Sequence, residues 1–168
     1  IFKRNTINMK PLCVVSCPID TFSGYGARSR DFVKALIQLK DIEWDIKILP
    51  QRWGECPWNF LSQDDPLRQR FINGLDQNKQ PDIWVQITIP NEFQAVGKSF
   101  NIGVTAGIET TILPGGMIEG INRMNLTLIS SEHSKNVALS TQFEKVSSTT
   151  KEKIGVVKCE KPVEVLFE

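Results

Sequence analysis

The sequence predicts an α/β protein with a Rossmann-like parallel sheet and helices on both of its faces. Short apolar segments rich in β-branched residues alternate along the chain with segments whose apolar residues recur at helical spacing. Strands separated by helices pair in parallel through right-handed crossovers, and a parallel sheet is normally covered on both sides. The length of 168 residues suits one such domain.

Six segments are predicted as strands. Most are short runs of Val, Ile, Leu and Thr bounded by proline, glycine or polar residues. In chain order they are residues 11–17, 44–49, 81–89, 100–105, 126–130 and 163–167. The second strand alternates apolar and charged side chains, which is typical of a strand with one partly polar face.

Four segments are predicted as helices: residues 27–40, 66–74, 114–124 and 132–139. In the first, a buried stripe is expected to contain Phe32, Val33, Leu36, Ile37 and Lys40, with Arg30, Lys34 and Gln38 facing solvent. Asp65 and Pro66 form a typical start for the second helix, and Ser131 is the expected N-cap of the fourth.

Two segments are predicted as loops. Trp53, Trp58 and Phe60 lie in the long segment after the second strand, and the pattern favours packing under that loop over an aromatic platform for a sugar or lipid. The polar residues 147–153 form the other loop.

Composition narrows the classes of partner. The formal net charge is +1, and no basic cluster interleaves with aromatic residues, so nucleic acid is not expected as a partner. No apolar run reaches the ~20 residues of a membrane span, and residues 1–10 do not resemble a signal peptide, so a cytoplasmic location is expected. The four cysteines are expected to be reduced, and a lone histidine far from them in sequence predicts no metal site.

Topology then selects the segments in which function is expected. In an open parallel sheet, ligands bind beyond the carboxyl ends of the strands, so the connections from strand to helix are the candidates. With the predicted elements these connections are residues 18–26, 50–63, 106–116 and 131–134.

The first of these connections contains Ser23, Gly24, Tyr25 and Gly26 at the start of a predicted helix. Glycines permit close backbone approach, and helix N-termini attract anions, so this loop suits a phosphate. The alternative is a plain turn in which the glycines only provide positive φ angles. Arg28 and Arg30 could each reach a phosphate or lie in solvent, and for either one alone solvent is favoured. NAD is disfavoured because Ser29 replaces the third glycine of the dinucleotide fingerprint.

The other candidates follow the fourth and fifth predicted strands. Glu109 and Thr110 follow the fourth strand, where the carboxylate could bind a sugar hydroxyl or, alternatively, cap a helix or order the loop. His133 could bind a substrate hydroxyl, although a lone histidine near a helix start is more often exposed or structural. With one histidine, no Ser-His-Asp triad can be assembled from the sequence.

Two blocks of sequence together resemble a known family. Residues 17–39 read CPIDTFSGYGARSRDFVKALIQL, and residues 105–139 read TAGIETTILPGGMIEGINRMNLTLISSEHSKNVAL. In this order and spacing they resemble the leading halves of GT-B-fold glycosyltransferases of the family 4 (group 1) class, in the branch with Gly-Tyr-Gly and Glu-Thr. The resemblance covers residues 9–168, and residues 162–168 resemble the last strand of such a half.

The resemblance implies a two-domain enzyme that transfers a sugar from a nucleotide-sugar donor to an acceptor, with retention and without a metal or other cofactor. This chain would be the N-terminal, acceptor-side domain, inactive without its C-terminal donor-binding domain. Ser23, Gly24, Tyr25, Gly26 and Arg28 would face the donor phosphates, together with Thr110 and His133 as substrate-binding residues. Glu109 would be the catalytic candidate, because the histidine that many members carry after the fourth strand is absent. The alternative from another class is a non-enzymatic Rossmann-like module that binds a phosphorylated ligand.

Overall fold

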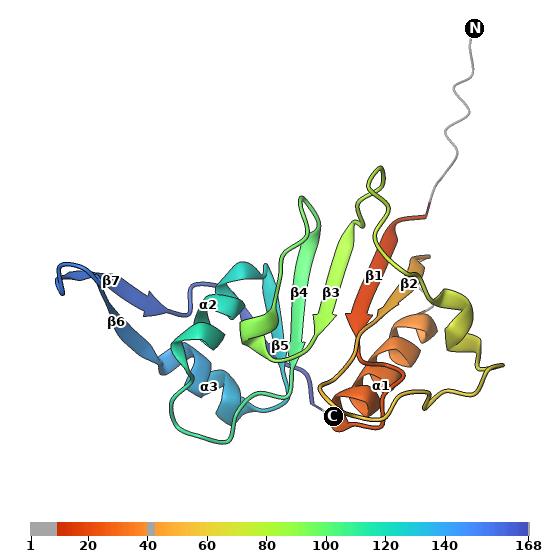
Figure 1. Ribbon diagram of the computed structural model, residues 1–168, viewed down its shortest axis with the longest axis horizontal. Coiled ribbons are helices and arrows are strands. Elements are labelled where there is room, and N and C mark those ends of the chain that lie inside the picture. Colours follow the sequence, from red (N-terminus) through yellow and green to blue (C-terminus); the bar gives the residue numbers. More distant parts are fainter. Residues whose placement is uncertain (1–9, 40–42, 168) are drawn as a thin grey trace, which may run out of the picture.

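The computed structural model describes residues 10–39 and 43–167. Its centre is a single six-stranded sheet in which every pair of neighbouring strands is parallel (Figure 1). The strands are β1 (Leu12–Cys17), β2 (Asp45–Pro50), β3 (Ile83–Ile87), β4 (Phe100–Thr105), β5 (Leu126–Ile129) and β8 (Val163–Val165). Their spatial order is β2-β1-β3-β4-β5-β8. The six predicted strands and the Rossmann-like α/β fold class are therefore confirmed.

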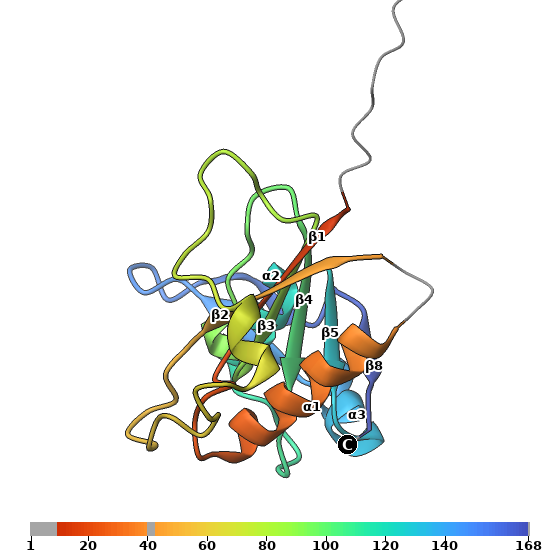
Figure 2. The ribbon, with the colours of Figure 1, turned by 90° about the vertical axis from the view of Figure 1, so that its right-hand side faces the viewer.

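Helices cover both faces of this sheet, as predicted. On one face, α1 (Gly24–Gln38) buries Val33 against Val15 and Ile48. On the other face, α2 (Gly115–Arg123) and α3 (Glu132–Ser140) pack around Ile129 through Ile118 and Val137. Figure 2 views the sheet from the end that carries β2, so α1 is nearest to the viewer and α2 lies deeper in the molecule. The order of strands explains this division, because right-handed crossovers toward β2 and toward β8 leave the sheet on opposite sides.

An antiparallel hairpin projects from one end of the molecule and was missed in the sequence. Its strands are β6 (Gln142–Val146) and β7 (Lys153–Lys158) (Figure 1). Residues 147–152 of the predicted loop form the turn between them, and Lys153 begins β7. Val157 packs against the cluster formed by α2 and α3, and Lys145 Nζ lies 3.7 Å from Glu119 Oε1 on α2. β6 carries only two apolar side chains and β7 is interrupted by Gly155, so neither segment has a strong strand pattern.

The predicted helix 66–74 is wrong in length. Only Pro66–Arg70 form a short 3-10 helix, and Asp65 caps it by accepting a hydrogen bond from the amide of Leu67 at 2.8 Å. The chain then becomes extended, because the amide of Ile72 donates to the carbonyl of Ile48 on β2 at 2.8 Å. Pairing with the sheet therefore ends the helix that the side-chain spacing predicted.

The expected division of α1 into a buried and a wet side needs two corrections. Arg30 was expected in solvent, but only 7% of it is exposed, and its guanidinium donates to the carbonyls of Ile19 and Thr21 at 2.8 and 3.0 Å. Ile37 was expected in the core but is 37% exposed. Arg30 is buried because the loop before the helix, residues 18–23, supplies the carbonyls that its guanidinium binds. Lys40 lies outside the described residues.

Two further findings concern the cysteine thiols and the length of the helices. All four cysteines are free thiols, and burial raises the pKa of Cys13 to about 11 and that of Cys17 to about 12. Within the part of the chain that the structure describes, no helix is long and apolar enough to cross a membrane.

Candidate functional site

The glycine loop, residues 18–26, joins the carboxyl end of β1 to α1 and includes the first residues of that helix. Ser23 determines its shape. The hydroxyl of Ser23 accepts a hydrogen bond from the amide of Gly26 at 2.9 Å, so Ser23 is the N-cap of α1. This cap starts the helix at Gly24, three residues before the predicted start at Ala27. A Cβ atom on Gly26 would overlap the carbonyl oxygen of Thr21, so the second glycine allows the loop and helix to pack closely.

Gly24 has a different environment. An added Cβ atom would meet nothing within 4 Å, and neither Gly24 nor Gly26 has a positive φ angle. The alternative interpretation, in which the glycines only provide positive φ angles, is therefore wrong. Gly24 and Tyr25 occupy the first two helical positions, whose amides have no acceptor within an α-helix. Helix N-termini of this kind attract anions, and binding of a phosphate by these amides stays a prediction.

Tyr25 connects the glycine loop to the segment after β4. Its hydroxyl lies 3.0 Å from Oγ1 of Thr105 and accepts a hydrogen bond from the amide of Ala106 at 3.2 Å. Its ring stacks on Trp53, with the ring centroids 4.2 Å apart and the planes inclined by 28°. Three connections at the carboxyl edge, after β1, β2 and β4, therefore meet at this one side chain.

The segment after β4 is held against the start of α3. The hydroxyl of Ser134 donates to the carbonyl of Ile108 at 2.9 Å and accepts from its amide at 3.2 Å. His133 Nε2 lies 3.3 Å from the carbonyl oxygen of Thr110. Glu109, Thr110 and His133 are exposed and belong to this joined segment. The structure thus brings these three predicted residues to one part of the carboxyl edge.

Glu109 does not cap a helix. α2 begins at Gly115 with Pro114 at its N-cap position, and α3 is capped by Ser131, whose hydroxyl accepts from the amide of Ser134 at 3.1 Å. Among the described residues, no hydrogen bond or ion pair involves the Glu109 carboxylate. The side chain is therefore available to a ligand at this edge.

Arg28 points toward the end of the described chain. Its guanidinium donates to the carbonyl of Leu166 at 3.0 Å, and the two residues line a groove of about 410 Å³ together with Phe32 and Phe167. A contact between Arg28 and a phosphate at the first turn of α1 remains a prediction.

A buried network of charges that the sequence did not indicate holds the segment after β2. The carboxylate of Asp20 is fully buried and accepts hydrogen bonds from the amide of Leu61 at 2.8 Å and from Arg68 at 3.0 Å. The guanidinium of Arg30 lies 3.5 Å from the ring centroid of Phe60. These contacts fix the long aromatic segment against the glycine loop.

A cavity of about 440 Å³ lies at the same edge, on the face opposite α1. It is bounded by the segment after β2, which contains Trp53, and by residues 88–96 after β3, which contain Glu92. Sequence reasoning missed this region because residues 90–99 show no helical pattern, so the connection after β3 was not among the selected segments. In the structure a 3-10 turn, Pro90–Glu92, follows β3.

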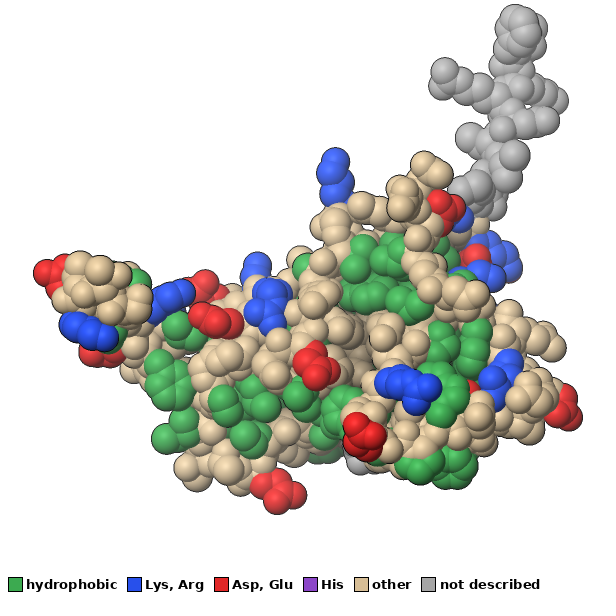
Figure 3. Space-filling model, in the orientation of Figure 1, with side chains coloured by type: hydrophobic (Ala, Val, Ile, Leu, Met, Phe, Trp, Pro, Cys, Tyr) green, Lys and Arg blue, Asp and Glu red, His purple; other side chains and the backbone are tan. Residues whose placement is uncertain are grey.

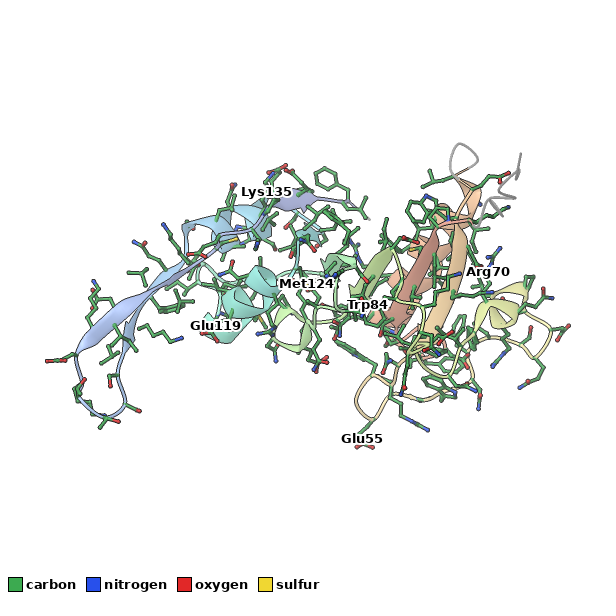
Figure 4. The ribbon with its side chains drawn as sticks, turned by 90° about the horizontal axis from the view of Figure 1, so that it is seen from above. Glu55, Arg70, Trp84, Glu119, Met124 and Lys135 are labelled. Atoms are coloured by element: carbon green, nitrogen blue, oxygen red, sulfur yellow. The ribbon has the colours of Figure 1, made fainter. Side chains whose placement is uncertain are left out.

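Figure 3 shows hydrophobic side chains gathered over β1 and β3 on this face, while charged side chains of both signs lie around its rim. Figure 4 shows Trp84 near the middle of the molecule and Glu55 at the outer end of the segment after β2, directed away from the sheet.

Among the described residues, no group of three or more His, Cys, Asp and Glu side chains could hold a metal ion.

The chain was compared with known protein families, curated proteins and solved structures. No protein-family model matches the chain, and neither a curated protein nor a solved structure matches it.

Proposed function

We propose that this chain is the leading, acceptor-side half of a GT-B-fold glycosyltransferase that uses a nucleotide sugar as donor. One observation carries the proposal. Tyr25 of the first block that resembles this family is 80 residues before Thr105 at the start of the second, yet its hydroxyl contacts Thr105 and Ala106. Both blocks therefore contribute to one site at the carboxyl edge, where α/β sheets bind ligands.

The residues have separate tasks in this proposal. The free amides of Gly24 and Tyr25, at the positive end of α1, would bind the donor diphosphate and stabilise the charge that grows as the sugar leaves. Glu109 would bind a sugar hydroxyl, and Thr110 and His133 would contact the same substrate. A C-terminal domain would hold the nucleotide. The chain supplies no metal chemistry in this proposal.

The experiment that tests the proposal uses the full protein that contains this chain, which is called the longer protein below. Sugar transfer from uridine and guanosine diphosphate sugars is measured for wild type and Gly24→Val. A side chain at this open position should block close approach of a phosphate and reduce kcat/KM on the order of 10- to 100-fold, with an unchanged melting temperature.

Gly155→Val is the matched control, because Gly155 is also open and lies in β7 of the hairpin, outside the segments in which function is expected. No transfer from any nucleotide sugar, or equal kinetics for Gly24→Val and the control, would contradict the proposal. Binding of inorganic phosphate that depends on Gly24, in a protein with no transferase activity, would instead support the non-enzymatic module.

A further inference from the structure

The cavity beside Trp53 has the size and position of a ligand site. Its volume of about 440 Å³ is in the range of small-molecule pockets, which is about 300–1,000 Å³. Pro18, from the glycine loop, and Trp53 both line it, and Trp53 also stacks on Tyr25. Trp53 therefore contacts both the cavity and Tyr25 in the first turn of α1.

The wall after β3 is rigid. The side-chain amide of Gln86 donates to the carbonyl of Glu92 at 3.1 Å and accepts from the amide of Gln94 at 2.8 Å. The indole of Trp84 donates to the carbonyl of Gln94 at 3.1 Å, and Phe93 is fully buried. Because these contacts fix both sides of Glu92, its carboxylate is positioned before any ligand arrives.

Glu92 provides a directed polar group at this wall. One carboxylate oxygen accepts a hydrogen bond from the hydroxyl of Thr88 at 2.5 Å. The other oxygen is free to accept from a ligand hydroxyl, since a carboxylate has about four acceptor sites. Gln51 and Arg52 line the opposite side of the cavity and provide donors.

The chemistry of the lining favours one class of ligand. Trp53 offers an aromatic face, which suits the C–H surface of a sugar ring, while Glu92, Gln51 and Gln94 suit its hydroxyl groups. Arg52 and Glu92 have opposite charges, so a phosphate at this cavity would meet one cation and one repelling carboxylate. A purely apolar ligand would leave these polar groups without partners.

We infer that this cavity binds a neutral saccharide and that, if the proposed glycosyltransferase function holds, this saccharide is the acceptor. Trp53 stacks on the sugar ring, and Glu92 is the specificity-determining residue that accepts a hydrogen bond from a ring hydroxyl. The position of the cavity next to the glycine loop places an acceptor hydroxyl on the same edge as the donor phosphates.

The test measures saccharide binding by the chain itself. Methyl glycosides of glucose, mannose, galactose and N-acetylglucosamine, and disaccharides of these sugars, are screened by saturation-transfer NMR and by tryptophan fluorescence. At least one saccharide is expected to bind. Glu92→Gln should weaken its binding about tenfold, as loss of a charged hydrogen bond does, and Trp53→Ala should weaken it further. Glu55→Gln is the matched control, because Glu55 is on the segment after β2 but points away from the cavity (Figure 4).

The outcomes separate this inference from the proposed function. Absence of saccharide binding, or binding that neither Glu92→Gln nor Trp53→Ala changes in folded variants, overturns the cavity assignment even when the longer protein transfers sugars. Saccharide binding that depends on both residues, in a protein without transferase activity, supports the cavity and rejects the enzyme. Trp53→Phe, which keeps an aromatic ring, should retain most of the binding.

Discussion

The buried ion pair between Asp20 and Arg68 gives the sharpest stability prediction. The Asp20 side chain is fully buried and that of Arg68 is 19% exposed, with Nη2 of Arg68 3.0 Å from Oδ2 of Asp20. Asp20→Asn keeps an oxygen for the amide of Leu61 but leaves the guanidinium without its counter-charge. Removing one partner of a buried pair costs about 3–5 kcal/mol. Because Arg68 is partly exposed, we expect a loss of about 3 kcal/mol in the free energy of unfolding.

Urea unfolding and thermal melting measure this loss. A destabilisation of that size should lower the Tm by about 6–12 °C in a domain of this length. The control is Glu164→Gln, which breaks the ion pair between Lys135 Nζ and Glu164 Oε2 at 2.8 Å. The Glu164 side chain is 62% exposed, and exposed pairs contribute little, so the control should melt close to wild type.

A double-mutant cycle with Arg68→Met then isolates the pair. Arg68 also donates to the carbonyls of Leu61 and Ser62, so its single substitution has a separate cost. If Asp20→Asn melts within 1 °C of the Glu164→Gln control, the buried pair does not hold the segment after β2, and the reasoning fails.

Three further predictions follow from the structure. The unfolded chain loses thiol protons near the ordinary pKa of 9.0, whereas folding holds those of Cys13 and Cys17 to about 11 and about 12. The free energy of unfolding should therefore fall as the pH rises above 9.0, by about 1.4 kcal/mol per pH unit and thiol, and Cys17→Ala should reduce this slope in urea titrations. Tyr25→Phe removes the hydroxyl that binds Thr105 and Ala106, and should cost about 1–2 kcal/mol of stability, measured by the same method; no loss would mean that the bridge is not a stabilising contact. Glu109→Gln should leave the Tm unchanged and reduce kcat/KM of the longer protein by about tenfold, because the carboxylate caps no helix; a lowered Tm with normal kinetics would show a structural role.

The sheet was predictable because its signals are local. A buried parallel strand reads as a short apolar run, and a helix N-terminus is indicated by its own capping residue. Ser131 illustrates the second point, since its hydroxyl accepts from the amide of Ser134 as a serine before a helix should. Within the sheet, Cys13 and Cys17 are buried as the apolar run around them predicts.

The predictions that failed concern residues whose structure depends on contacts outside their own segment. Residues after Arg70 have helical spacing but pair with β2, and an arginine on the expected wet side of α1 is buried because carbonyls from the preceding loop surround it. Neither effect has a signature in the local pattern. Glu92 is a different case, because its partners, Gln86 on β3 and Thr88 just beyond it, are near in sequence. Helix and strand patterns do not indicate such side-chain contacts within a loop.

The stacked pair of Tyr25 and Trp53 connects the two parts of the candidate site. Tyr25 is held at its hydroxyl by the end of β4, so its side chain cannot swing away without breaking the bonds to Thr105 and Ala106. Trp53 rests on that ring at 4.2 Å and lines the cavity. A ligand that moves the indole would therefore act on the first turn of α1, and an anion bound there would act on the cavity through the same contact. Because coupling between sites is reciprocal, saccharide affinity and phosphate affinity should change each other by the same factor, and Tyr25→Ala should remove that mutual effect.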